Sequence, residues 1–442
     1  MPLIPPFFAR HRVLIAICTC MAIAGSGIPQ VSYYFLRNKC LAHLHVCSPD
    51  DEINVIAFGW WPDASALGIY LANPGGTVQF PPNYTERIQS PLIVKSRTAI
   101  VFKGPATIRA HATITLERDS AIVCPPAADA PNSGNAACVI READNANLPA
   151  VVDLRGVNAV LSNVTVEGNR LKNPRGGVNI KVVGLRSRLD HVTSIGAATD
   201  GIQVGDAAIR NGGAGSKFEY VMSQMNGRNG LLLQNVADIF ISDSEFENNK
   251  HNGVSAWNAG AIRFVQNDLG GNSEDGIDIC GIAWHTERKG ACGSLVADHP
   301  NSDGWIIIGN QFGGNGEDDI SIDGWDSRTS SYVSMYHVID GNEFTGGALR
   351  PNDSYDAVKI QDSGINVISD NVCYPRDGKT LYRYGIAISQ TASHRELPDV
   401  IAANQVFHPG VAGFAVVSNT KLSGNNSQGL TPSSPGIVRM GH

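Results

Sequence analysis

Residues 249–256 read Asn-Lys-His-Asn-Gly-Val-Ser-Ala, and residues 272–279 read Asn-Ser-Glu-Asp-Gly-Ile-Asp-Ile. Both stretches place a polar turn before a Gly and a short run in which apolar and small or polar residues alternate. They lie 23 residues apart. A repeat of this length is the sequence signature of a solenoid, in which each unit buries its apolar face against its neighbours.

The same short strand recurs along the chain, and the shortest interval between copies is 23 residues. Longer intervals indicate coils that carry loop insertions. Side chains alternate between core and solvent along a strand, so Ile277 and Ile279 point inward and Asp278 points outward. The pattern predicts an all-β fold, a single-stranded parallel β-helix, which the crossover rule makes right-handed. The other copies begin at Gly177, Gly201, Gly230, Asp319, Ala357, Gly385 and Gly413.

A second apolar strand follows in each coil, and after it an Asn stands two residues before an apolar residue. Asn tolerates the left-handed backbone conformation of tight turns, and its amide can bond to the next coil. We therefore expect one column of stacked Asn side chains at this turn. Its members are Asn267, Asn310, Asn342, Asn371 and Asn404.

The ends of the chain differ from the repeat region. We predict a β-helix over residues 60–430, an N-terminal extension over 25–59 and a C-terminal tail over 431–442. A short helix over Ala64–Ala72 would cap the open end of the core, where strand edges are otherwise unpaired. Residues 73–82 follow as turn, strand and turn.

The N-terminus carries a targeting segment. Arg10 and Arg12 precede an apolar run from Val13 to Ala24, which ends in a small-x-small cleavage site. Residues 1–24 are therefore predicted to be a signal peptide, and the protein to be secreted or periplasmic. The alternative is a membrane anchor that stays uncleaved and extends to about residue 36.

Charge and cysteines narrow the partners and the compartment. Without residues 1–24 the chain holds 32 basic and 41 acidic side chains, which argues against a nucleic-acid partner. Of the nine cysteines, three near pairs are read as local disulfides of an exported protein. Cys373 occupies an apolar slot and is expected to be a buried free thiol. The predicted pairs are Cys40 with Cys47, Cys124 with Cys138, and Cys280 with Cys292.

Residues 73–82, Asn-Pro-Gly-Gly-Thr-Val-Gln-Phe-Pro-Pro, resemble the start of many pectate-lyase-superfamily β-helix proteins. In that superfamily a "PGGTV-x-hP" segment begins the stack of coils. The resemblance extends over residues 60–430 and implies the fold. It leaves the chemistry open, because the superfamily holds hydrolases, lyases, epimerases and phage tailspikes.

Acidic residues concentrate in two successive coils, at residues 274–278 and 317–323. Like charges on neighbouring strands destabilise a sheet and raise one another's pKa. Two carboxylates one coil apart are what a glycosidase needs, one as an acid and one to activate water or attack directly. The repeat aligns Glu274 with Glu317, Asp275 with Asp318 and Asp356, and Asp278 with Ser321 and Lys359.

The two acidic coils also resemble the polygalacturonase family of glycoside hydrolases. Residues 272–278 look like its "NTDGID" coil, residues 316–320 like its "GDDCI" coil, and Val358–Ile360 faintly like its "RIK" motif. The resemblance implies that Glu317 and Asp318 occupy the acid-pair places, with Asp275 opposite. The family's Gly-His-Gly is absent from this sequence.

We expect Glu317 or Asp318 to act as the acid, and Asp275 with the other of that pair to position or activate water. Trp257 aligns with Asp323, and an aromatic ring beside carboxylates suits stacking on a sugar. The expected substrate-binding residues are Asn252, Trp257, Asp278, Asp323, Trp325, Asp356 and Lys359.

The predicted function is an exported carbohydrate-active enzyme that cleaves a polysaccharide by glycoside hydrolysis. One alternative is a polysaccharide lyase or uronate C5-epimerase, and another is a non-catalytic glycan-binding or structural β-helix. No metal or other cofactor is expected, although calcium binding is the rival interpretation of the acidic coils. The expected partner is a polysaccharide or oligosaccharide, and a homotrimer stays open because β-helices often trimerise.

Overall fold

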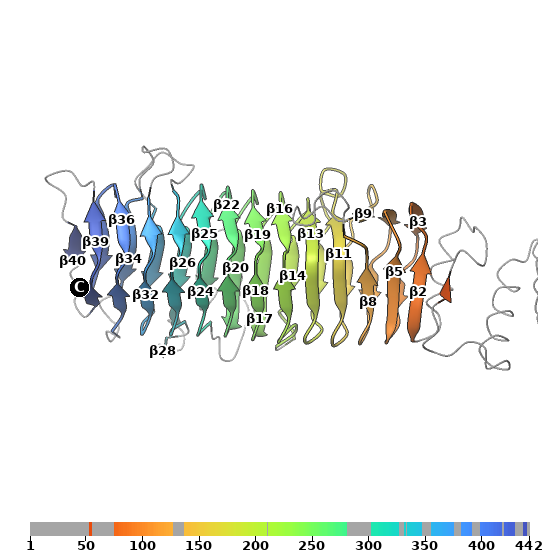
Figure 1. The fold of residues 1–442 in the computed structure, drawn as a ribbon, viewed down its shortest axis with the longest axis horizontal. Coiled ribbons are helices and arrows are strands. Elements are labelled where there is room, and N and C mark those ends of the chain that lie inside the picture. The colour runs from red at the N-terminus through yellow and green to blue at the C-terminus, as the bar shows by residue number, and fades with distance from the viewer. Residues whose placement is uncertain are drawn as a thin grey trace, which may run out of the picture.

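The computed structural model describes residues 53–54, 75–126, 137–209, 211–280, 302–326, 331–332, 334–346, 355–374, 382–390, 398–417, 420–428 and 436–439. These residues form a right-handed parallel β-helix, and none of them is in a helix. Figure 1 shows the coils stacked in chain order from β2 (Gly76–Phe80) to β40 (Ile437–Arg439). The predicted fold class is therefore confirmed.

Each coil of the central region holds three strands. One coil consists of β14 (Ile202–Val204), β15 (Lys217–Glu219) and β16 (Met222–Gln224). The sequence pattern predicted only the first two. The third strand lies in the segment that was predicted to be a turn followed by one apolar residue. It is too short for the repeat pattern to separate it from a turn.

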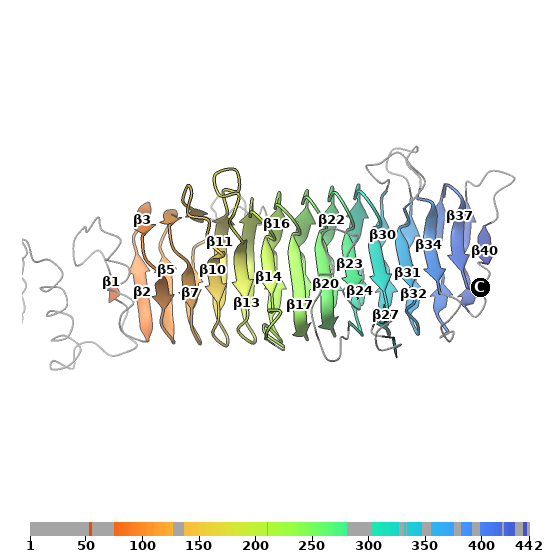
Figure 2. The same cartoon turned by 180° about the vertical axis from the view of Figure 1, so that it is seen from behind.

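The first strand of every coil belongs to a 13-stranded sheet, which we call the first sheet. All nine strands predicted from the repeat lie in it, in the predicted order (Figure 2). Its last strand, β40, pairs with β37 and so extends the sheet into residues 431–442. The other strands are β4 (Leu92–Val94), β7 (Ile114–Leu116), β10 (Ala150–Leu154), β12 (Val178–Val182), β17 (Leu231–Ala237), β20 (Val254–Gly260), β23 (Ile277–Cys280), β26 (Ile320–Asp323), β31 (Val358–Gln361), β34 (Tyr384–Ser389) and β37 (Ala412–Val416).

The second and third strands of the coils together form a 25-stranded sheet. After β15, the second strands are β18 (Phe240–Ser242), β21 (Arg263–Val265), β24 (Ile306–Ile308), β29 (Val338–Asp340), β32 (Val367–Ser369), β35 (Val400–Ala402) and β38 (Lys421–Ser423). After β16, the third strands are β19 (Glu245–Glu247), β22 (Asp268–Gly270), β25 (Gln311–Gly313), β30 (Glu343–Phe344), β33 (Val372–Cys373), β36 (Gln405–Phe407) and β39 (Asn426–Gln428).

The N-terminal coils use longer strands. β11 (Val160–Glu167) and β13 (Arg188–Ile195) each run through both rows of the 25-stranded sheet. The remaining strands of this sheet are β1 (Ile53–Asn54), β2, β3 (Tyr84–Ile88), β5 (Thr98–Phe102), β6 (Ala106–Ala110), β8 (Ala121–Val123) and β9 (Cys138–Glu142). A separate antiparallel pair joins β27 (Trp325–Asp326) to β28 (Ser331–Tyr332).

The core is a stack of like residues inside the coils. Ile277 and Ile279 are fully buried, as the alternation predicted. Phe312 and Phe344, on neighbouring third strands, stack with ring centroids 5.0 Å apart. Cys373 is a buried free thiol in this column, as expected. The residues that point inward therefore follow the predicted register.

The predicted Asn column is present and bonds from coil to coil. The backbone N–H of Asn267 donates to Oδ1 of Asn310 at 2.8 Å, and the pattern continues through Asn342, Asn371 and Asn404 to Asn425. The predicted left-handed conformation of these Asn residues is wrong. It falls one residue earlier, at Gln266, Gly309, Gly341, Asp370 and Ala403, which leaves each Asn free to turn its amide inward.

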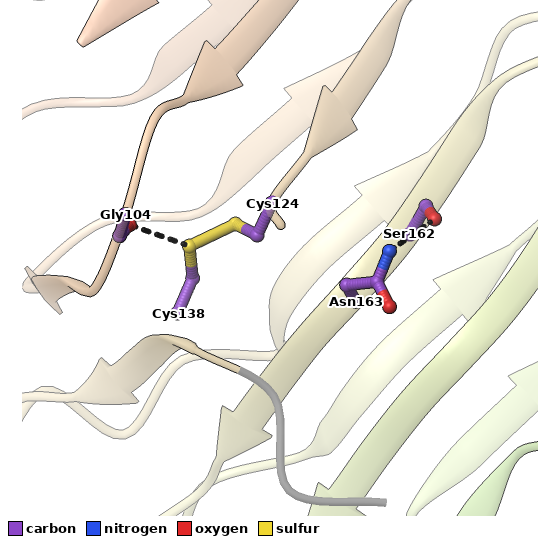
Figure 3. The surroundings of a disulfide bond; sticks show 5 residues. All are labelled: Gly104, Cys124, Cys138, Ser162 and Asn163. Atoms are coloured by element: carbon purple, nitrogen blue, oxygen red, sulfur yellow. Dashed lines mark hydrogen bonds between the residues drawn. A yellow bond between two sulfur atoms is a disulfide. The ribbon is translucent and has the colours of Figure 1, made fainter. Parts of the chain in front are cut away.

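Two of the three predicted disulfides involve residues that the structure describes. Cys124 and Cys138 form a disulfide, with Cα atoms 6.1 Å apart (Figure 3). Cys280 is also disulfide-bonded, and its predicted partner Cys292 lies outside the described residues. So do residues 1–52, with the predicted signal peptide and the pair of Cys40 with Cys47, and the predicted helix over Ala64–Ala72. Among the described residues, no helix is long and apolar enough to cross a membrane.

Candidate functional site

The predicted acidic column lies along the first sheet. Asp278 pairs with Ser321, which pairs with Lys359, and Trp257 pairs through Cys280 with Asp323. The structure thus brings together the residues that the repeat aligned. Their surroundings, however, differ from those of an open cleft.

Asp275, Asp318 and Asp356 belong to a hydrogen-bond ladder. Oδ1 of each accepts the backbone N–H of the next coil, at 2.9 Å from Asp318 and 2.7 Å from Asp356. Asn229 and Asn252 accept in the same way on the preceding coils. All five side chains are at most 3% exposed. These aspartates therefore accept the same coil-to-coil hydrogen bonds that Asn side chains accept on the preceding coils.

Cations neutralise the last two carboxylates of the ladder. Lys359 Nζ lies 3.2 Å from Oδ2 of Asp318, and Arg383 donates to both oxygens of Asp356, at 2.6 and 3.1 Å. Burial raises the pKa of Asp356 to about 6, and the hydrogen bond from Arg383 opposes that rise. Arg383 was not predicted. It lies just before β34 (Tyr384–Ser389) and so outside the four-residue pattern that repeats from coil to coil.

The other predicted residues are placed less favourably for substrate binding. Trp257 is only 7% exposed and packs with Leu232 and Cys280, which leaves little of its ring open for the predicted stacking on a sugar. Asp278 is equally buried, while Glu317 and Asp323 are half-buried. The backbone of Trp325 lies in β27, and its side chain lies outside the description.

Asp319, beside the ladder, forms a buried cluster of its own. Asn315 Nδ2 donates to its Oδ1 at 2.7 Å, and the Tyr382 hydroxyl donates to its Oδ2. The Tyr382 hydroxyl accepts the backbone N–H of Gly346 at 3.0 Å. Burial raises the pKa of Asp319 to about 7. The Asp319 carboxyl is buried and inaccessible to a substrate, and this hydrogen-bond cluster links residues of three coils.

An open surface hollow lies elsewhere, over the third strands. Two adjoining depressions, of about 560 and 720 Å³, share Asp268 and Gln311. We call them together the acidic groove. The smaller depression is lined by Glu247, Tyr374 and several glycines. The larger one is lined by Glu245, Asp243 and the rings of His191 and Tyr220.

The groove follows from the sequence of the third strands. Outward positions of β19 carry Glu245 and Glu247, and Glu245 pairs with Asp268 of β22. The next outward position is Gly270, paired with Gly313 on β25. A Cβ added at Gly270 would lie 3.7 Å from Oε1 of Glu247. The missing side chains therefore leave the floor open beside a carboxyl group.

The carboxyl groups of the groove perturb one another. Partial burial raises the pKa of Glu247, and the charges of Asp268 and Glu245 raise it further. Partial burial and Asp268 likewise raise the pKa of Glu245. A protonated carboxyl beside an ionised one is the arrangement that acid/base catalysis requires.

Aromatic rings stand at both ends of the groove. His191 and Tyr220 stack with centroids 4.5 Å apart, and Tyr220 is 49% exposed. At the other end the Tyr374 hydroxyl donates to Glu343. Exposed rings with a polar edge suit the faces of sugars.

The groove was not predicted, because the third strand of each coil cannot be recognised from the repeat pattern. Two cues were present: a Gly-Gly pair after Leu269 and another after Phe312, one coil apart. Among the described residues, no group of three or more His, Cys, Asp or Glu is arranged to hold a metal ion.

Comparisons with known proteins agree on the architecture. The family described as "Right handed beta helix region" matches residues 130–269. No curated protein matches the chain.

Several solved structures are similar to the chain at low identity. The Dettilon tailspike protein (gp208) aligns with a TM-score of 0.52 at 10% identity, over 92% of this chain and 73% of the other. The A-module of the Azotobacter vinelandii mannuronan C-5 epimerase AlgE6 aligns with 0.50 at 14%, over 86% and 100%. The catalytic domain of a GH87 α-1,3-glucanase in complex with nigerose aligns with 0.47 at 12%, over 89% and 69%. At these identities likeness shows the fold alone, and the chain is a right-handed parallel β-helix.

Proposed function

We propose that the protein is a carbohydrate-active enzyme that hydrolyses a polysaccharide in the acidic groove. The observation that carries the proposal is Glu247, whose pKa is raised, beside Asp268 in an open hollow. The fold is compatible with an enzyme that acts on a sugar polymer, since one similar structure is a mannuronan C-5 epimerase. Export by the N-terminal segment forms part of the same proposal.

The two carboxyl groups take different roles. Glu247 is the general acid, because partial burial and the charges of Asp268 and Glu245 raise its pKa and favour its protonated form. Asp268 is the base that activates water on the other side of the bond. Glu245 lies directly opposite Asp268, and its charge helps to raise the pKa of Glu247.

The shape of the groove suits a polymer. The hollow crosses several coils, from His191 on β13 to Tyr374 beyond β33, so a chain of sugars can lie along the stack. Gln311 lies where the two depressions meet and offers an amide to sugar hydroxyls. The aromatic rings at the ends provide faces for pyranose rings.

A lyase or epimerase acting on a uronate is the second candidate, and it belongs to the predicted column on the first sheet. Such an enzyme needs a cation that neutralises the substrate carboxylate. Lys359 and Arg383 supply cations there, beside Asp318 and Asp356. The described lining of the acidic groove contains neither Lys nor Arg, which favours hydrolysis in the groove.

The test is a screen of purified protein on plant and bacterial polysaccharides. It measures new reducing ends together with the ultraviolet absorbance of unsaturated uronates. We expect reducing ends without that absorbance. Glu247→Gln and Asp268→Asn should each lower the rate by about 10²–10⁴, the usual contribution of a general acid or base. Glu219→Gln, on the second-strand row, is the matched control.

Three outcomes would contradict the proposal. If Glu317→Gln and Asp318→Asn abolish activity while Glu247→Gln leaves it intact, the site is the predicted column. Unsaturated products would identify a lyase. Binding without either product would identify a non-catalytic glycan-binding protein.

A further inference from the structure

We infer that the polysaccharide bound in the acidic groove carries free amino groups, as a partly N-deacetylated amino-sugar polymer does. This inference rests on the proposed function for the location of the site. It goes further in naming the charge and the chemical class of the substrate.

The first step is the charge of the lining. Asp243, Glu245, Glu247 and Asp268 face the groove, and among its described lining residues His191 is the sole basic side chain. Among the residues that the structure describes, the lining thus has four carboxyl groups and neither Lys nor Arg. A polyuronate would place its carboxylates against these groups, and like charges at a binding surface exclude the wrong partner.

The second step separates a cationic sugar from a neutral one. Glu245 and Asp268 face each other across neighbouring strands, about 4.8 Å apart in the sheet. The charge of Asp268 raises the pKa of Glu245, so the two carboxyl groups repel each other. An ammonium group between the two side chains removes the repulsion and gains charge-assisted hydrogen bonds. The groove therefore favours an amino sugar over its N-acetylated form.

The third step is the shape of the ligand. The carboxyl groups lie within one open hollow that has an exposed, stacked ring pair, His191 with Tyr220, at one end. A ring presents its face to the C–H groups of a pyranose, which a bare metal ion lacks. Together the ring pair and the carboxyl groups match a cationic sugar chain.

The experiment compares three oligomers of equal length by calorimetry on the full chain: glucosamine, N-acetylglucosamine and galacturonate. We expect the glucosamine oligomer to bind at least tenfold more tightly than the N-acetylated one at low salt. This ratio should shrink at about 0.5 M salt, where charge interactions are screened. The galacturonate oligomer should bind most weakly.

Asp243→Asn and Glu245→Gln should each reduce glucosamine affinity several-fold and leave N-acetylglucosamine affinity unchanged. Glu219→Gln, whose carboxylate pairs with Lys217 outside the groove, should change neither. Equal binding of the two amino-sugar oligomers, preference for galacturonate, or displacement of glucosamine by calcium would each overturn the inference.

Failure of this inference and failure of the proposed function give different results. Selective glucosamine binding without hydrolysis would refute the enzyme and leave the ligand class standing. Hydrolysis of a neutral polymer that depends on Glu247 and Asp268 would confirm the enzyme and refute the amino-sugar substrate.

Discussion

The backbone N–H of Asp356 donates a 2.7 Å hydrogen bond to Oδ1 of Asp318, one coil back along the helix. The same position holds Asn229 and Asn252 on earlier coils, where amide oxygens accept the equivalent bond. The ladder therefore requires an acceptor oxygen and does not require a charge. At Asp318, where the ladder carries a carboxylate, Lys359 lies 3.2 Å from its Oδ2.

Asp318→Asn should leave the free energy of unfolding within about 1 kcal/mol of the wild type, because the amide keeps the acceptor. Asp318→Ala should cost about 1–3 kcal/mol, since the buried N–H of Asp356 then lacks a partner. Urea denaturation measures both. Asn252→Ala is the matched control and should cost a similar amount. Equal losses from the Asn and Ala variants would show that the pair with Lys359 matters more than the ladder.

The buried carboxyl of Asp319 predicts a pH dependence. Burial raises its pKa from 3.8, the value of a solvent-exposed Asp, to about 7 in the fold, so the folded state holds the proton more tightly. Stability from this group is complete below pH 3.8 and is lost as the pH rises toward 7. Asp319→Asn should therefore flatten the fall in melting temperature over this range. A wild-type slope that persists in the variant would contradict the assignment.

The other buried groups set the background for this measurement. Burial raises the pKa of Glu142 to about 7 and that of Asp399 to about 6, with the same sign of effect. His337 acts oppositely, since burial lowers its pKa to about 3 and its contribution is lost as the pH falls below 6.5. The difference between wild type and variant at each pH isolates Asp319 from these groups.

The sequence was sufficient for the first sheet and the Asn column. Strands such as β23 (Ile277–Cys280) carry two inward apolar residues, Ile277 and Ile279, and follow a recurring turn, so their period and register can be read directly from the sequence. The third strands hold one inward residue each, such as Phe246 or Leu269, and one residue has no period. The strands that carry the groove were therefore missed.

The candidate site was harder to predict than the fold, for a physical reason. An Asp just before a parallel strand can accept a neighbouring backbone N–H or face a substrate, and both uses place the same residue at the same spacing. Asp275 and Asp318 align as predicted, yet their oxygens accept hydrogen bonds from the next coil. Only the hydrogen-bond partners distinguish the two uses, and these depend on the packing of the coils.

Ile365 occupies a left-handed conformation, with φ at 60°, on an exposed corner of its coil. A β-branched residue is disfavoured there, at a cost of roughly 1–2 kcal/mol. Ile365→Gly should therefore raise the free energy of unfolding by about 1 kcal/mol. Gly304 holds the corresponding corner two coils earlier with φ at 70°, so Gly304→Ala should lower it by about as much. A loss of stability in Ile365→Gly would mean that the Ile side chain packs usefully.

The stereochemistry of the products identifies which glutamate is the acid. Glu245 lies directly opposite Asp268, at a strand spacing of about 4.8 Å, which suits a retaining enzyme with carboxyl groups about 5 Å apart. Glu247 lies two residues further along β19, which puts its Cα roughly 8 Å from that of Asp268. A separation of this size between the carboxyl groups themselves leaves room for a water between acid and base, as inverting enzymes require. We therefore expect inversion at the anomeric carbon, read by proton NMR at early times. Retention would instead assign the acid role to Glu245, and Glu245→Gln would then lose more activity than Glu247→Gln.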